Sequence, residues 1–121
     1  TASDYTRSLS ETIVAIARHS SSVIVGRGAH LILDPERSLR VRAYAPLEKR
    51  NEYVSEREGM SPWEAKAKVE RVDAERRDFF QKHFDTDITD PLNYDLLINT
   101  STMSLAAAAE VVGSAYGVRF S

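Results

Sequence analysis

In the stretch Leu39-Arg40-Val41-Arg42-Ala43-Tyr44-Ala45-Pro46, apolar and more polar side chains alternate up to Ala45, and a proline follows. A period of two predicts a strand over residues 39–45 with one covered face and one exposed face. Proline fits the first turn of an α-helix because the N–H that it lacks has no partner there. The helix that follows is expected to end before Gly59, a typical residue just beyond a helix.

Two shorter runs predict further strands. Residues 23–25 (Val-Ile-Val) and 96–98 (Leu-Leu-Ile) are continuously apolar, as in strands that are covered on both faces of a parallel sheet. Helices are expected over residues 4–19, over residues 62–84 and from position 102 or 104 onward. Strands that alternate with helices indicate an α/β fold.

We therefore expect one domain over residues 1–121, a three-layer α/β/α arrangement around a small parallel sheet. Three strands are few for such a sheet, so a further strand is expected from a partner or from residues upstream of Thr1. For the same reason we expect the chain to form a homo-oligomer. The candidate contact is an apolar stripe on the first helix that consists of Tyr5, Leu9, Ile13 and Ile16.

Composition excludes several classes of function. The net charge of −2 makes it unlikely that the protein coats nucleic acid. The absence of cysteine rules out disulfides and thiolate chemistry. The three histidines are scattered, so no metal site built from protein ligands is expected. The longest apolar run is about five residues, and the first residues lack a signal-peptide pattern. We expect a cytoplasmic protein with no membrane partner.

Arg27 is the first candidate binding residue. It lies between Gly26 and Gly28 and follows the predicted strand at residues 23–25. Ligands of open parallel sheets bind beyond the carboxyl ends of the strands, and a guanidinium suits a phosphate there. The alternative is an ordinary turn with a surface arginine. The phosphate-binding loop G-x-x-x-x-G-K-[ST] does not occur in these 121 residues.

The predicted helical hairpin over residues 47–84 carries nine basic and nine acidic side chains. Arg50 and Arg57 are seven residues apart and share a face of the first helix, whereas Asp73 and Arg76 share a face of the second. An Asp three residues before an Arg can bind a base edge with one side chain and a phosphate with the other. The alternative is a solvated surface with a weak intrahelical ion pair.

Four segments together resemble the cytidylate kinase-like family of P-loop nucleoside monophosphate kinases: Val23-Ile24-Val25-Gly26-Arg27-Gly28-Ala29, Ala45-Pro46-Leu47-Glu48-Lys49-Arg50, Val72-Asp73-Ala74-Glu75-Arg76 and Tyr94-Asp95-Leu96-Leu97-Ile98-Asn99-Thr100. The resemblance implies a five-stranded parallel sheet, of which this chain matches the last three strands. It also implies phosphoryl transfer from ATP with Mg²⁺, where the first strand and its phosphate loop are present.

The resemblance also implies roles for individual residues. Arg27, Asp73 and Arg76 would bind the nucleoside monophosphate, and Arg50 and Arg57 would be catalytic arginines of a lid formed by the hairpin. Gly28 stands where the stricter cytidylate kinases have Asp, and Val69 stands where the resemblance leads us to expect a further phosphate-binding Arg. Arg40 and Arg42 are unusual in a central strand. A binding or regulatory module that senses a nucleotide or anion, and a purely structural dimer-forming domain, remain alternatives to a kinase.

Overall fold

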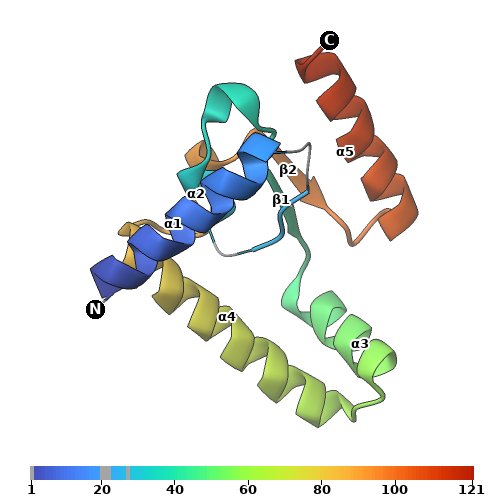
Figure 1. The fold of residues 1–121 in the computed structure, drawn as a ribbon. Helices are drawn as coiled ribbons and strands as arrows, with labels where there is room; N and C mark the ends of the chain where they lie inside the picture. Colours follow the sequence, from blue (N-terminus) through green and yellow to red (C-terminus); the bar gives the residue numbers. More distant parts are fainter. Residues whose placement is uncertain (1, 20–22, 27) are drawn as a thin grey trace.

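The computed structural model of the protein describes residues 2–19, 23–26 and 28–121. Its elements, in chain order, are α1 (Ala2–His19), α2 (Ala29–Ile32), the 3₁₀ turn η1 (Pro35–Arg37), β1 (Val41–Tyr44), α3 (Leu47–Glu58), α4 (Pro62–Phe84), the 3₁₀ turn η2 (Pro91–Asn93), β2 (Leu96–Asn99) and α5 (Leu105–Arg119). The described chain is mostly helical, and α1 with α2 lies on one side of the strands while α5 lies on the other (Figure 1). The expected α/β class is confirmed in this form.

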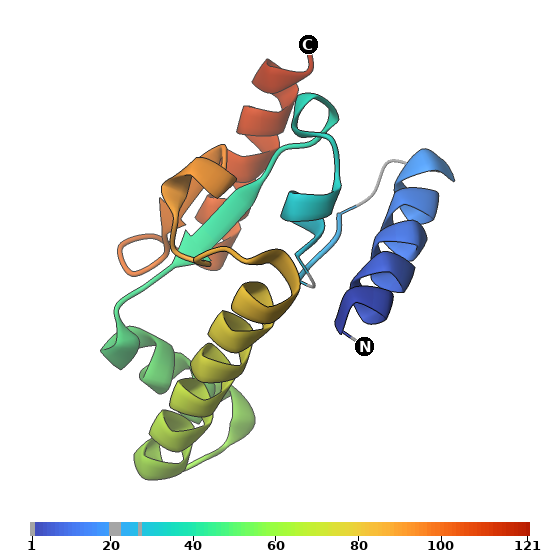
Figure 2. The same ribbon diagram turned by 90° about the vertical axis from the view of Figure 1, so that its left-hand side faces the viewer.

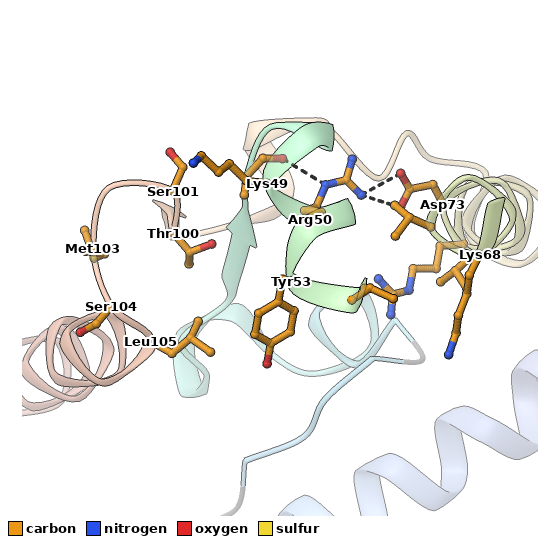
Figure 3. Close-up of a pocket in the computed structure, with 15 residues that line it drawn as sticks. Lys49, Arg50, Tyr53, Lys68, Asp73, Thr100, Ser101, Met103, Ser104 and Leu105 are labelled. Carbon is orange, nitrogen blue, oxygen red and sulfur yellow. Dashed lines mark hydrogen bonds and ion pairs between the residues drawn. The ribbon is translucent and has the colours of Figure 1, made fainter. Parts of the chain in front are cut away.

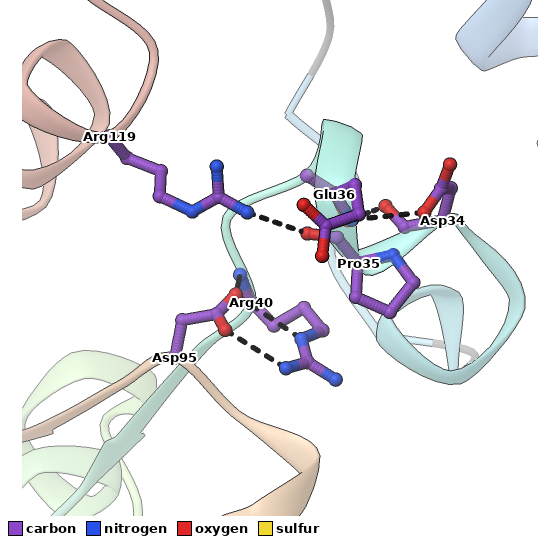
Figure 4. Close-up of polar contacts among 7 residues, drawn as sticks. Asp34, Pro35, Glu36, Arg40, Asp95 and Arg119 are labelled. Carbon is purple, nitrogen blue, oxygen red and sulfur yellow. Dashed lines mark hydrogen bonds and ion pairs between the residues drawn. The ribbon is translucent and has the colours of Figure 1, made fainter.

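The sheet consists of β1 and β2, which run parallel and pair Val41 with Leu96 and Tyr44 with Asn99. A side-chain bridge holds the amino ends of the two strands together (Figure 4). The Asp95 carboxylate accepts hydrogen bonds from the backbone N–H of Arg40 at 2.8 Å and from its guanidinium at 2.9 and 3.2 Å. These bonds hold the pKa of Asp95 below its usual range. Arg40 therefore helps to fix the register between β1 and β2, which explains why a basic side chain directly precedes β1.

The strand expected at residues 23–25 is not present, and this prediction was wrong. The segment has no regular secondary structure, and Val23 and Val25 are 92% and 88% exposed. Figure 2 shows it as an extended stretch between α1 and α2. A run of β-branched residues becomes a strand only where a neighbouring strand accepts its hydrogen bonds, and no described segment does so here.

The helices α3 and α4 form the expected hairpin, which projects away from the sheet (Figure 1). Gly59 ends α3 with a φ of 64°, a left-handed conformation that glycine adopts without strain. The Ser61 hydroxyl then accepts the backbone N–H of Glu64 and caps α4, as its sequence predicts. Farther along, Lys68 of α4 forms an ion pair with Glu58 of α3, with N···O distances of 2.6 and 2.8 Å.

One part of the core lies at the carboxyl end of α4, where α1 packs against this helix and the His30 ring of α2 lies 5.4 Å from the ring of Phe80. Phe80 is buried, and the neighbouring Phe79 meets the ring of Tyr5 edge-on at a centroid distance of 6.3 Å. Ile13 is only 4% exposed. Of the α1 stripe that we expected to form an oligomer contact, Ile13 is therefore covered within the chain itself, whereas Tyr5 is 44% exposed. The side chain of Ile16 lies outside the described residues.

The last helix, α5, begins where the Ser104 hydroxyl accepts the N–H of Ala107. Only Ala108 of this helix is buried, and Leu105 and Tyr116 are 58% and 52% exposed. Arg119 joins its far end to η1 by donating to the Pro35 carbonyl at 3.0 Å (Figure 4). None of the helices in the described ranges is long and apolar enough to cross a membrane.

Candidate functional site

A cavity of about 680 Å³ lies between the α3–α4 hairpin and the segment that joins β2 to α5 (Figure 3). Ala45, just beyond β1, and Thr100, just beyond β2, both line it. The cavity is therefore at the carboxyl edge of the parallel sheet, where α/β proteins bind their ligands. Its lining divides into a charged wall on the hairpin and a hydroxyl-bearing wall on the β2–α5 segment.

Arg50 is the central residue of the charged wall. Its Nε donates to the carbonyl of Ala45 at 3.0 Å, which fixes the guanidinium at the root of the hairpin. Its Nη1 donates to both carboxylate oxygens of Asp73, each at 2.8 Å. The side chains of Arg50 and Asp73 are 37% and 35% exposed, so this ion pair is in contact with solvent.

The other basic side chains of this wall differ in the ion pairs that they form. Lys68 is held by Glu58, whereas Lys49 lies 3.8 Å from Glu52 in a loose, exposed pair. Arg76 lines the cavity and has no ion-pair or hydrogen-bond partner among the described residues. Four basic side chains and one carboxylate therefore line the cavity, which favours an anionic ligand.

The opposite wall presents hydroxyl groups from Thr100, Ser101 and Ser104. The Ser101 hydroxyl donates to the side-chain oxygen of Asn99 at 2.6 Å, and the Thr100 hydroxyl donates a long hydrogen bond to the carbonyl of Tyr44 at 3.4 Å. Because the protons of Thr100 and Ser101 are used in this way, these two hydroxyls offer mainly lone pairs to a ligand. This wall thus suits a group that donates hydrogen bonds, such as a sugar hydroxyl or an amino group.

The structure brings together three of the five residues singled out from the sequence, namely Arg50, Asp73 and Arg76, in this one cavity. Arg57 is not among the residues that line it. Its guanidinium instead donates to the Tyr53 hydroxyl at 2.8 Å and lies 5.8 Å from the centre of that ring. Arg27 lies outside the described residues.

Sequence reasoning missed Lys49, Tyr53 and the hydroxyl wall. The signal for Thr100 and Ser101 was available, because both follow directly after a predicted strand of a parallel sheet. Lys49 could not be distinguished from the many other charges of the hairpin. Its position in the cavity depends on how α3 leaves the sheet, and this follows from tertiary packing.

Residues 1–102 match the cytidylate kinase-like family. The chain belongs to this family. Among curated proteins, a cytidylate kinase of Pyrococcus horikoshii is 32% identical over 102 residues, which is 84% of this chain and 53% of the relative. The chain thus spans about half the length of that kinase. The recognition of the family from its four segments is confirmed.

The structure shows the surroundings of Gly28 and Val69, where the resemblance leads us to expect an aspartate and an arginine. Gly28 has a φ of 73°, and a Cβ at this position would lie 2.5 Å from the Phe84 ring. An aspartate here would therefore need a different backbone and a displaced ring. Val69 is 7% exposed and also lines the cavity, so the longer side chain of an arginine at this position would extend into the cavity.

Proposed function

We propose that this chain forms the acceptor side of a nucleoside monophosphate kinase and that the cavity binds the nucleoside monophosphate, with cytidine monophosphate as the first candidate. The observation that carries the proposal is the convergence of Arg50, Asp73 and Arg76 from two helices in one cavity whose charged side chains are mostly basic. The family relationship supports a nucleotide as the ligand. In this proposal the phosphate lies toward Arg76 and Arg50, and the sugar lies toward the hydroxyls of Thr100 and Ser101.

Phosphoryl transfer would need ATP, Mg²⁺ and a phosphate-binding loop, and no such loop occurs in these 121 residues. In the complete enzyme that we propose, a larger three-layer α/β/α domain supplies the loop. In this proposal Arg50 and Arg57, the arginines of the hairpin lid, would stabilise the charge that develops on the transferred phosphoryl group. We expect this chain alone to bind the acceptor but to show no transfer above a buffer blank.

Calorimetric titration with cytidine monophosphate tests the proposal. Arg76→Ala removes a cavity arginine, whereas Arg77→Ala removes the neighbouring exposed arginine of the same helix, which does not line the cavity. We expect Arg76→Ala to weaken binding about tenfold or more, in line with loss of a charge-assisted hydrogen bond. Equal affinities of the two variants, or no binding by the unmodified chain, would argue against this site.

The alternative is a module that senses a nucleotide or anion without catalysis. It uses the same cavity and predicts the same binding. The two functions separate when the chain is joined to a phosphate-loop segment from a family member. Turnover that depends on Arg50 would then support the kinase, and binding without turnover would support the sensor.

A further inference from the structure

We propose that Asp73 is an internal competitor of the ligand for Arg50, so that phosphate binding must exchange one anionic partner of this arginine for another. This inference rests on the proposed function, since it concerns the same cavity. It assigns Asp73 a second task, which is to neutralise Arg50 while the site is empty.

The geometry of the pair favours such an exchange. Both contacts to Asp73 come from one nitrogen of Arg50, its Nη1. An arginine binds an oxyanion most strongly when two different nitrogens donate in parallel to two oxygens, and this arrangement is not used here. A phosphate oxygen pair can offer it. The incoming anion would therefore replace a shared contact with a paired one.

Arg50 need not move for this to happen. Its Nε is held by the backbone carbonyl of Ala45 at 3.0 Å, independently of Asp73. Only the Asp73 carboxylate has to turn away, and its 35% exposure gives water access to it. Arg76 lies one turn farther along α4, on the same face, and has no partner among the described residues. The displaced carboxylate thus stays beside a cation.

The consequence is that the resting site is less attractive to anions than its number of arginines suggests. Replacing Asp73 by asparagine keeps the shape of the side chain but removes the competing charge. Affinity for a small anion should then rise. A residue that served only to bind the ligand, or only to hold the hairpin together, would lower the affinity when it is changed.

The test is calorimetric titration with sulfate at low ionic strength, because sulfate has no base that Asp73 could bind. We expect Asp73→Asn to bind sulfate about twofold to fivefold more tightly than the unmodified chain, the range for a partly exposed ion pair. Asp78→Asn is the matched control, an exposed aspartate of the same helix that does not line the cavity. It makes the same change in net charge and should leave the affinity nearly unaltered.

The gain should disappear in the double variant Arg50→Ala/Asp73→Asn, because the competition is for that guanidinium. Asp73→Asn that binds sulfate no more tightly than Asp78→Asn would overturn the inference, even if Arg76→Ala still weakens nucleotide binding and the proposed function stands. Absence of binding by every variant, with sulfate and with cytidine monophosphate, would overturn both.

A measurement on the unmodified chain covers the case in which Asp73→Asn fails to fold. The side-chain carboxyl carbon of Asp73 should change its NMR chemical shift during the sulfate titration, with the same midpoint as the calorimetric binding. The carboxyl of Asp78 should not follow it. An Asp73 resonance that stays in place at saturating sulfate would show that the pair does not open.

Discussion

Asp95 is expected to be the strongest single polar contributor to the two-stranded sheet. Its carboxylate accepts three hydrogen bonds from Arg40, and the side chains of Arg40 and Asp95 are only 18% and 24% exposed. Hydrogen bonds to a charged group contribute about 1.5–3 kcal/mol to stability. Removal of the Asp95 carboxylate leaves the backbone N–H and the guanidinium of Arg40 without their acceptor. We therefore expect Asp95→Ala to lower the free energy of unfolding by about 2–3 kcal/mol.

Asp95→Asn separates charge from hydrogen bonding. The amide oxygen of the asparagine can still accept the backbone N–H of Arg40, so the free energy of unfolding should fall by only about 1 kcal/mol. Urea unfolding followed by circular dichroism measures both values, and Asp78→Asn on the exposed face of α4 is the control. Equal losses for the two Asp95 variants, or a loss no larger than that of the control, would refute this reasoning.

The pH dependence of the same contact has a definite sign. The bonds from Arg40 lower the pKa of Asp95 in the folded state below its ordinary value of about 3.8. The unfolded chain therefore takes up this proton at a higher pH than the folded one. The contribution of Asp95 is present above that ordinary value and is lost as the pH falls through the folded-state pKa. The stability difference between the unmodified chain and Asp95→Asn should narrow over this range.

Three further outcomes are expected. Gly28→Asp should lower stability by about 2–4 kcal/mol, because the residue has a left-handed backbone and its Cβ would meet the Phe84 ring at 2.5 Å; Phe84→Leu should recover part of this loss in urea unfolding. Burial lowers the pKa of His30, whose Nε2 has no hydrogen-bond partner in the described structure, so stability should fall as the pH drops below about 6.5, and His30→Phe should flatten that part of the curve. Arg57→Ala should change the affinity for cytidine monophosphate less than about twofold, whereas Arg50→Ala should weaken it about tenfold in calorimetry, since only Arg50 lines the cavity.

The aromatic cluster around His30 shows how a contact can escape sequence reasoning. The His30 ring stacks on Tyr94 at a centroid distance of 4.8 Å and lies 5.4 Å from Phe80. These three residues come from α2, α4 and the short segment between η2 and β2. No local pattern marks His30 as a member of an aromatic cluster, because a histidine in a short helix is more often exposed.

The sequence by itself determined the four long helices, the end of α3 and the starts of α4 and α5. Ser61, Gly59 and Ser104 act on backbone groups within a few residues of themselves, so their effect can be read from neighbouring letters. The same holds for the strand at residues 41–44 and for the family, which four short segments identify.

Only the tertiary structure decided which partners these elements find. Residues 23–25 have the composition of a strand but no described neighbour to pair with. Asp73 binds Arg50, 23 residues away, instead of Arg76 on its own helix, and Asp95 binds Arg40 across 55 residues. Propensity and capping are local energies, whereas ion pairs and strand pairing depend on which distant segments the packing of the core brings together. The cavity, made of an arginine-rich hairpin and a hydroxyl-bearing loop, is a product of that packing.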